Sequence, residues 1–408
     1  MKKTILLIFV LIYFINSANA QWQECGPGNG LVCIYLNGST IFAGSHGMGI
    51  YKSTNNGDTW SIVSNGLPGF IGTGDYDDVT AIARKENNIF VGTQNCGIYM
   101  STDSGANWYA VNNGITDLNI TSLAVHDSII FAGTDYGGGI FSSADNGAHW
   151  AAVNNGLSNP YVSSLAVKGS SIYAGTQYWN GGVFKSTNNG ANWSLISAGL
   201  PQETVREIAI KDTTDVFVAY PSHGIYFTDN SGTTWSKINN GLADTNILSI
   251  KVCNSIVFTG TSLENIFLST DDGMNWSPFN DNLVGCHPIW DFAINESYIF
   301  AIDGGGNGLL RRLIKDIVTY NEVDTDNAKF VLYPNPTSDK LFVDFKLSVK
   351  SHIKVKMFDM MGKQIMNTME GYWKDDKIEL DIGRCATGMY MLKIETADKI
   401  YDYKISKE

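Results

Sequence analysis

The chain has 408 residues, and its 40 aspartates and glutamates outnumber its 28 lysines and arginines, for a formal net charge of −12. An acidic chain with so few cationic side chains does not suit nucleic-acid binding, in which a basic surface neutralises phosphates. The six cysteines follow no paired Cys-x-x-Cys spacing, so the sequence predicts no metal site and no cofactor, and it leaves any disulfide pairing open.

The first twenty residues have the features of a signal peptide. Lys2 and Lys3 form a basic start, residues 5–15 form an apolar core, and Ala18-Asn19-Ala20 is a small-residue cleavage site. No later stretch approaches the ~20 consecutive apolar residues of a membrane-spanning helix, so we predict no transmembrane segment. We expect residues 1–20 to be removed and an exported chain to begin at Gln21.

Residues 21–313 contain a repeat. The motif Ser/Thr-x-Asp/Asn-x-Gly-x-x-Trp occurs six times, and its tryptophans lie 48, 42, 43, 42 and 41 residues apart. Each copy follows two short alternating or apolar runs and precedes an Asn-Gly turn, as in residues 79–114. A period of this length, built from short β-branched and aromatic runs, is typical of a four-stranded propeller blade.

The first two runs of the repeat occur seven times, but the seventh copy lacks the motif and its fourth strand. The segment Trp22-Gln23-Glu24-Cys25 resembles the fourth strand of the other copies, for example residues 108–111. The sequence therefore predicts an all-β fold: a seven-bladed β-propeller over residues 21–313, closed by its N-terminal strand. Such closure would leave no open junction between the first and last blades.

The repeated motif resembles the Asp box, or BNR repeat, of sialidase-type propellers, and it is similar to that of photosystem-assembly-factor-like and sortilin-like propellers. In those families the box is structural, because its acidic side chain and glycine form a turn on which the tryptophan packs. The resemblance implies the same role here for Asn55, Gly57, Trp60, Asp103, Gly105, Trp108, Asp145, Gly147, Trp150, Asn188, Gly190, Trp193, Gly232, Trp235, Asp271, Gly273 and Trp276.

Residues 314–329 are polar and without periodicity, and are predicted to be a linker. Residues 330–408 are predicted to form a small antiparallel β-sandwich. Their motifs, residues 333–336, 358–365, 388–394 and 404–407, resemble the type A sorting domain of the type IX secretion system. The resemblance implies a Bacteroidota-type host, passage through the outer membrane by that machinery, and removal of the tail by a sortase-like enzyme. Release from the cell or attachment to its surface would follow.

Two kinds of glycoside hydrolase would place different demands on this sequence. The sialidase resemblance implies a clamp of three arginines, but the propeller contains only Arg84, Arg206, Arg311 and Arg312, of which the last two are adjacent in one strand and point to opposite faces. An endo-glycanase needs two carboxylates. The available ones are Asp75, Asp77, Asp78, Glu207 and Asp291, of which Asp75 and Asp291 are the candidate catalytic residues.

A ligand site is expected in the irregular loops. The loops between second and third strands lie on the same side as the connections between blades, whereas the repeated motifs lie on the opposite side. The candidate ligand-binding residues on the loop side are Tyr136, Tyr178, Trp179, Asn180, His287 and Trp290. Aromatic side chains beside amides suit glycan, peptide or protein binding, although loop packing would also explain them. We predict an exported or surface-attached, non-catalytic binding propeller, with a glycoside hydrolase as the alternative.

Overall fold

Every named element in the described part of the chain is a β-strand. The computed structural model describes residues 21–28, 30–69, 76–178, 180–253, 256–281, 283, 285, 287–314, 330–333, 337, 339–345, 350–359, 363–366, 368–374, 377–386, 388–396 and 400–407. The predicted signal peptide, Asp75, Trp179 and nearly all of the predicted linker lie outside these residues. The chain divides into two units, Met1–Ile317 and Val318–Glu408.

The first unit contains seven four-stranded antiparallel sheets among the described residues. The first strands are β2 (Leu31–Asn37), β6 (Val79–Lys85), β10 (Ile120–His126), β14 (Val162–Lys168), β18 (Glu207–Ile210), β22 (Ile247–Cys253) and β26 (Ile289–Ile294). The second strands are β3 (Thr40–Ser45), β7 (Asn88–Thr93), β11 (Ile129–Thr134), β15 (Ser171–Thr176), β19 (Val216–Tyr220), β23 (Ile256–Thr261) and β27 (Tyr298–Asp303).

The third and fourth strands complete each sheet. The third strands are β4 (Ile50–Ser53), β8 (Ile98–Ser101), β12 (Ile140–Ser143), β16 (Val183–Ser186), β20 (Gly224–Thr228), β24 (Ile266–Ser269) and β28 (Gly308–Leu313). The fourth strands are β5 (Ser61–Ile62), β9 (Tyr109–Ala110), β13 (Ala151–Ala152), β17 (Ser194–Leu195), β21 (Ser236–Lys237), β25 (Ser277–Pro278) and, in the last sheet, β1 (Gln23–Glu24).

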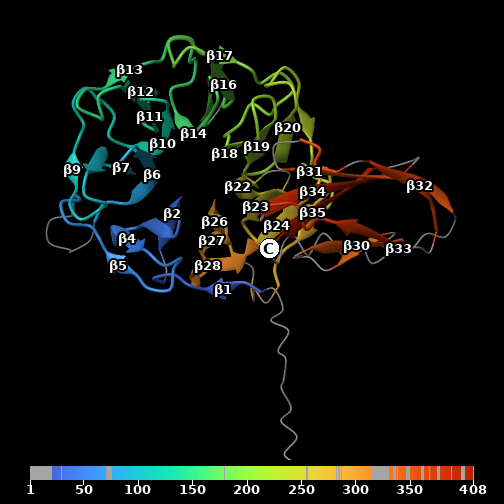
Figure 1. Ribbon diagram of the computed structural model, residues 1–408. Helices are drawn as coiled ribbons and strands as arrows, with labels where there is room; N and C mark the ends of the chain where they lie inside the picture. Colours follow the sequence, from blue (N-terminus) through green and yellow to red (C-terminus); the bar gives the residue numbers. More distant parts are fainter. Residues whose placement is uncertain are drawn as a thin grey trace, which may run out of the picture. The chain divides into compact units, whose positions relative to one another are not determined.

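The seven first strands lie around a common centre, and the short fourth strands lie at the periphery (Figure 1). The second strands are apolar on both faces and almost wholly buried, because each is covered by a neighbouring sheet on either side. The hydrophobic core consequently lies between sheets: Phe131 and Ile140 of the third sheet pack with Val162, Phe184 and Trp193 of the fourth. This burial explains the repeated short apolar runs of the sequence.

The last sheet has the strand order β1-β28-β27-β26, so its fourth strand comes from the N-terminal end of the described chain. Gln23 pairs with Arg311, and Glu24 pairs with Leu310. Trp22 is only 3% exposed and donates its indole N–H to the Phe279 carbonyl at 2.9 Å, which anchors this strand in the core shared with the sixth sheet.

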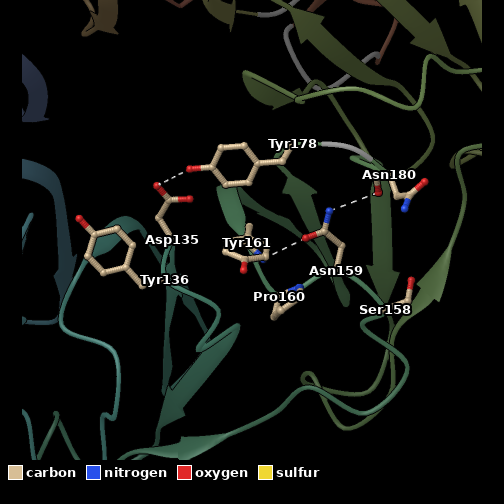
Figure 2. A pocket seen from close by; sticks show the side chains of 8 residues that line it. All are labelled: Asp135, Tyr136, Ser158, Asn159, Pro160, Tyr161, Tyr178 and Asn180. Atoms are coloured by element: carbon tan, nitrogen blue, oxygen red, sulfur yellow. Dashed lines mark hydrogen bonds between the residues drawn. The ribbon is translucent and has the colours of Figure 1, made fainter.

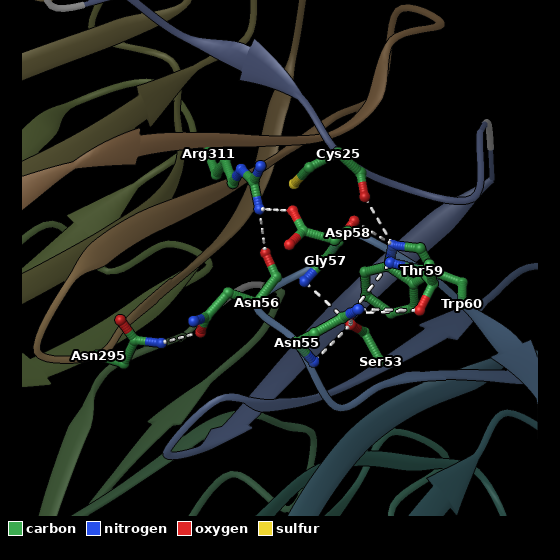
Figure 3. Close-up of polar contacts among 10 residues, drawn as sticks. All are labelled: Cys25, Ser53, Asn55, Asn56, Gly57, Asp58, Thr59, Trp60, Asn295 and Arg311. Atoms are coloured by element: carbon green, nitrogen blue, oxygen red, sulfur yellow. Dashed lines mark hydrogen bonds and ion pairs between the residues drawn. The ribbon is translucent and has the colours of Figure 1, made fainter.

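Polar contacts also join the last sheet to the first (Figure 3). The Arg311 guanidinium donates to the Asp58 carboxylate at 2.6 Å, and the Asn295 amide donates to the Asn56 side chain at 2.9 Å. The Trp60 indole donates to the Cys25 carbonyl at 2.6 Å. The first and last sheets are therefore joined by hydrogen bonds, two of which link residues more than 200 positions apart in the sequence.

Each repeated motif forms a turn between a third and a fourth strand. In the second sheet the Ser101 hydroxyl donates to Asp103 and accepts from the Gly105 N–H, both at 2.8 Å, while the Asn107 N–H donates to Asp103 at 2.9 Å. Gly105 has a φ of 90°, which suits glycine. The hydrogen bonds from Asn107 lower the pKa of Asp103 to about 2. The fifth turn uses Asn230 in the same way, a residue that our sequence assignment omitted.

The Ser101→Ala variant should lower the free energy of unfolding by about 1–2 kcal/mol, because the Gly105 N–H is left buried without its acceptor. Urea denaturation measures the loss. The control is Ser194→Ala in β17, where the side chain is exposed and the expected change lies within about 0.5 kcal/mol. Equal stabilities of the two variants would show that the hydroxyl does not stabilise the turn.

The second unit has a three-stranded sheet of order β29-β30-β33 and a four-stranded sheet of order β32-β31-β34-β35. The strands are β29 (Phe330–Tyr333), β30 (Lys340–Phe345), β31 (Ser351–Asp359), β32 (Met369–Trp373), β33 (Lys377–Asp381), β34 (Gly388–Glu395) and β35 (Ile400–Lys407). Both sheets contribute to one core, in which Leu341 and Leu380 lie with Val355, Leu392 and Ile405.

Candidate functional site

The loops between second and third strands and the connections between sheets lie on one side of the first unit, which we call the loop face. Antiparallel pairing places them there, and hydrogen bonds such as Gly139 N–H to the Pro160 carbonyl join them. Seven of its large apolar or aromatic side chains are exposed to solvent: Met48, Leu118, Tyr136, Tyr161, Tyr178, Leu263 and Trp290. Exposed apolar groups concentrated on one face are typical of a binding surface.

A cavity of about 540 Å³ opens between the third and fourth sheets on this face (Figure 2). It is formed by the β11–β12 loop, the connection from β13 to β14, and the β15–β16 loop. We call it the tyrosine pocket, and it is lined by Asp135, Tyr136, Ser158, Asn159, Pro160, Tyr161, Tyr178 and Asn180. Its volume lies within the range of small-ligand sites, about 300–1,000 Å³.

Buried polar side chains hold the loops of the tyrosine pocket in place. Asp117, 7% exposed, accepts the backbone N–H groups of Tyr136 and Gly138 at 2.8 and 3.1 Å. Asn159 donates its amide to the carbonyls of Gln177 and Asn180 at 2.8 and 3.2 Å. Because these bonds tie each loop to the connection beside it, the pocket is largely formed before any ligand arrives.

Tyr178 occupies an unusual conformation in the pocket. Its φ of 63° lies in the left-handed region, which a bulky side chain adopts only under the constraint of its surroundings. The Thr204 hydroxyl accepts its backbone N–H at 2.9 Å, and its ring packs edge-on against Tyr161 with centroids 5.2 Å apart. The ring is nevertheless 52% exposed, so the local strain holds an aromatic surface open to solvent.

Asp135 supplies the negative charge of the pocket. It accepts the Gln177 amide at 2.9 Å and the Tyr178 hydroxyl at 3.2 Å. Burial raises the pKa of the Asp135 carboxyl, the Tyr178 hydrogen bond opposes that effect, and the charge of Asp117 adds to it. Neither Asp135 nor Asp117 has an ion-pair partner among the described residues.

The structure brings three of the six predicted ligand-binding residues together, namely Tyr136, Tyr178 and Asn180. Trp179 lies outside the described residues. The other two lie at the start of the seventh sheet: His287 pairs with Asp303 at 3.0 Å, and Trp290 stacks under the Arg206 guanidinium at 5.7 Å. His287 and Trp290 are therefore not part of the tyrosine pocket.

Sequence reasoning missed Asp135, Asn159 and Tyr161. For Asp135 a signal was present, because Gln94, Gln177 and Ser262 hold the corresponding place after the last residue of the second strand. The single carboxylate at this position is a departure from the repeat. Nothing comparable marks Tyr161, since the connections between sheets differ in length.

The candidate catalytic carboxylates already have structural partners. Asp291 accepts the Ile34 N–H at 3.0 Å and the Phe292 N–H at 2.7 Å, one on each oxygen. Glu207 accepts the Ile250 N–H at 2.8 Å. Asp77 binds the backbone and side chain of Asn95, and Asp78 pairs with His46 at 2.7 Å, while Asp75 lies outside the described residues.

The carboxylates of Glu207 and Asp291 also affect each other's charge. The pKa of Glu207 is raised to about 7, chiefly because burial penalises its charged form and also because Asp291 repels it. Burial likewise raises the pKa of Asp291, against the opposing charges of Lys251 and Arg206. The charges of Lys251 and Arg206 also act on Glu207, where they oppose the rise of its pKa.

The four propeller arginines contact different partners. Arg311 pairs with Asp58 and Arg312 pairs with Asp281 on the opposite face, as predicted from their adjacency. Arg84 donates to the Glu86 carbonyl, and Arg206 donates to the Leu248 carbonyl. The described residues also include no group of three or more metal-ligating side chains, and no helix long and apolar enough to cross a membrane.

Comparisons with known proteins identify both units. Residues 73–284 match the DUF6242 beta propeller domain, and residues 331–408 match the Secretion system C-terminal sorting domain. The second match confirms the predicted tail and indicates handling by type IX secretion machinery, with export across the outer membrane to the cell surface or the extracellular space. A search of the curated proteins finds no match.

Solved structures with similar folds are propellers of distant sequence. YCF48 from Cyanidioschyzon merolae is 14% identical, with a TM-score of 0.57 over 72% of this chain and 98% of that one. YCF48 bound to D1 peptide is 12% identical, with a TM-score of 0.58 over 72% and 96%. U3-55K is 11% identical, with a TM-score of 0.56 over 72% and 99%. At these identities the likeness shows the fold alone.

The propeller match covers just over half of the chain, and the sheets described above agree with it. The predicted all-β propeller is thereby confirmed. This chain belongs to the DUF6242 beta propeller domain family and carries a C-terminal secretion sorting domain.

Proposed function

We propose that this protein is an exported seven-bladed propeller, closed by its N-terminal strand, that binds an extracellular ligand in the tyrosine pocket and catalyses no reaction. Residues 1–20 act as its signal peptide. The tail folds as a two-sheet sandwich and is removed by a sortase-like enzyme of a Bacteroidota host. The ligand is a glycan, a peptide or a protein.

Two sets of hydrogen bonds support the closed ring. In each of the seven sheets a tryptophan donates its indole N–H to a carbonyl of the preceding sheet. The donors are Trp22, Trp60, Trp108, Trp150, Trp193, Trp235 and Trp276. Trp22 thus takes the place of the missing seventh motif, and Cys25 accepts from Trp60 as Val63 accepts from Trp108.

The second set bridges the first strands around the centre. The bonds are Cys33 Sγ to Val79 O, Thr80 Oγ1 to Ile120 O, Thr121 Oγ1 to Val162 O, Ser163 Oγ to Val205 O, Arg206 Nε to Leu248 O, Ser249 Oγ to Ile289 O and Ile34 N to Asp291 Oδ2. Every neighbouring pair of sheets is bridged, including the seventh and the first. A closed ring explains all seven bridges together.

The observation that carries the binding function is the preformed tyrosine pocket. Tyr178 is held in a strained conformation with half of its ring exposed, and Asp117 and Asn159 tie down the loops around it. Strain that keeps an aromatic ring in solvent is explained by a ligand more readily than by folding. YCF48 bound to D1 peptide is an example of this fold with a peptide ligand.

The alternative function, a glycoside hydrolase, is favoured by Glu207 and Asp291, because one protonated and one ionised carboxyl would supply an acid and a nucleophile or base. We place it second. Both oxygens of Asp291 already accept backbone N–H groups, and each carboxylate bridges its strand to a neighbouring sheet. Their positions are explained by the need to join sheets.

The test is binding of the full-length protein to a glycan array and to randomised peptide mixtures. Tyr136→Ala and Tyr178→Ala should each weaken binding of the retained ligand by about tenfold or more, because exposed aromatic anchors carry much of the energy of such sites. Tyr109→Ala is the matched control, since Tyr109 is 59% exposed in β9 outside the pocket. Equal binding by all three variants would rule out the tyrosine pocket.

A polysaccharide-hydrolysis screen tests the alternative with the same protein. We expect no turnover. Turnover that Asp291→Asn abolishes, while its far-UV circular dichroism stays that of the wild type, would replace the binding function with the hydrolase.

A further inference from the structure

The tyrosine pocket has an uncompensated negative charge. Asp135 is the one charged residue among the described lining residues, and Asp117 accepts hydrogen bonds from the backbone of Tyr136 and Gly138 behind it. Neither carboxylate has a cationic partner among the described residues. Burial raises the pKa of the Asp135 carboxyl, the Tyr178 hydrogen bond opposes that effect, and the charge of Asp117 adds to it.

Aromatic rings surround this carboxylate. Tyr178 donates its hydroxyl to Asp135, Tyr161 packs edge-on against Tyr178, and Tyr136 follows Asp135 in the chain with 70% of its side chain exposed (Figure 2). The faces of tyrosine rings attract ammonium and guanidinium groups, by about 0.5–1 kcal/mol at an exposed site and more where water is excluded. The tyrosine rings and the Asp135 carboxylate therefore both favour a positively charged ligand group.

The surroundings of the pocket suit a peptide more than a glycan. Leu118 is 40% exposed on the connection that carries Asp117, and it is the exposed apolar side chain that this connection offers beside the pocket. A peptide supplies both a cationic side chain and apolar neighbours, whereas neutral and acidic glycans supply no positive charge. The acidic chain would also attract a basic partner over long range.

We propose that the tyrosine pocket binds the cationic side chain of a lysine or arginine in an extended peptide segment of a partner protein. This inference rests on the proposed binding function and names the ligand class of the same site. The Asp135 carboxylate forms an ion pair with this cationic group. Tyr136, Tyr161 and Tyr178 enclose the alkyl stem and the charged end of the ligand side chain. A peptide residue beside the cation lies on the exposed Leu118.

The experiment uses the full-length protein and mixtures of short peptides in which the central residue is lysine, arginine, norleucine or glutamate and every other position is randomised. Norleucine matches the lysine stem without its charge. We expect lysine and arginine mixtures to bind about tenfold more tightly than the norleucine mixture, and the glutamate mixture to bind least. Raising the salt concentration should reduce this preference.

Asp135→Asn is the decisive variant, because its side chain keeps acceptor and donor groups for Gln177 and Tyr178 while the charge is lost. It should bind lysine and norleucine mixtures within about twofold of each other. The control is Asp229→Asn, which removes one exposed carboxylate from a turn on the opposite side and should keep the lysine preference.

The outcomes separate the two proposals. Suppose that lysine and norleucine mixtures bind equally to the wild type, or that only a glycan binds. If Tyr178→Ala still abolishes that binding, the proposal of a cationic ligand group is wrong and the binding function stands. If Tyr178→Ala changes no interaction at all, both proposals fail. A lysine preference that survives Asp135→Asn would also overturn the assignment of Asp135.

Discussion

Deleting residues 22–25 should lower the thermal unfolding temperature of the propeller sharply and promote self-association. The deletion removes strand β1 and leaves the edge of β28 unpaired, and an open edge is a template for pairing with another chain. Trp22→Ala alone should lower the free energy of unfolding by about 3–5 kcal/mol, because a nearly fully buried indole is lost from the core between the sixth and seventh sheets.

Two further variants show what Trp22 contributes. Trp22→Phe keeps an aromatic ring but loses the bond to the Phe279 carbonyl, and should cost about 1–2 kcal/mol. Gln23→Ala changes an exposed side chain in the same strand and should be nearly neutral. Urea denaturation followed by far-UV circular dichroism measures all of them. Unchanged stability in the deletion variant would contradict closure of the ring by the N-terminal strand.

Stability of the propeller should fall as the pH rises from about 4.5 towards 7. The pKa of Glu207 is 4.5 in its ordinary state and about 7 in the folded protein, so the folded state holds an extra proton in this window. A carboxyl whose pKa is raised by folding stabilises the folded state fully at a pH below its unfolded-state pKa. This stabilisation is lost as the pH rises through its folded-state pKa. Because Glu207 is only partly buried, solvent screening limits the effect, and we expect a loss of about 1–2 kcal/mol.

Glu207→Gln should remove most of this pH dependence, since glutamine still accepts the Ile250 N–H but carries no charge towards Asp291. Denaturation at several pH values between about 5 and 8 compares it with the wild type. Glu296→Gln, an exposed control in the β26–β27 turn, should retain the wild-type profile. Parallel profiles for the wild type and Glu207→Gln would show that this carboxyl does not titrate in the window.

The loss of folding stability that we expect below about pH 4 has a separate cause. Hydrogen bonds within the repeat turns lower the pKa of Asp103 and Asp145 to about 2, so protonation of these carboxyls opposes folding only at lower pH. The two effects have opposite signs, and stability is expected to be highest near pH 4–5.

The repeat made most of the fold predictable. Each tryptophan of the motif binds the preceding sheet, so its recurrence reports one supersecondary unit and its length. Trp22 could be recognised as part of that series because the short segment after it, residues 23–25, resembles residues 109–111 after Trp108. The tail was equally readable, since its motifs occur in a fixed order within residues 330–408.

The site was predictable only in part. Tyr136 and Tyr178 stand out as aromatic residues in the variable loops, but their neighbour Tyr161 lies in a connection from another part of the repeat. Sequence placed His287 and Trp290 beside them because all lie on the loop face. In three dimensions they lie at a different sheet, since position around a ring depends on how the sheets pack.

The catalytic candidates show a similar limit. Asp291 lies on the first strand β26, but its partner Ile34 lies 257 positions away in sequence. That bond identifies the carboxylate as a bridge between sheets, and no local pattern around Asp291 predicts it.

The sequence by itself therefore determined the elements that repeat: strand order within a sheet, the turn with its tryptophan, and the identity of the sorting tail. These follow from local periodicity, in which each residue is specified by neighbours within one unit. The tertiary structure alone decided which loops meet, which carboxylates lack a cation and which bridge two sheets. Such contacts join residues of different units, and the energies that select them come from packing across the interface between sheets.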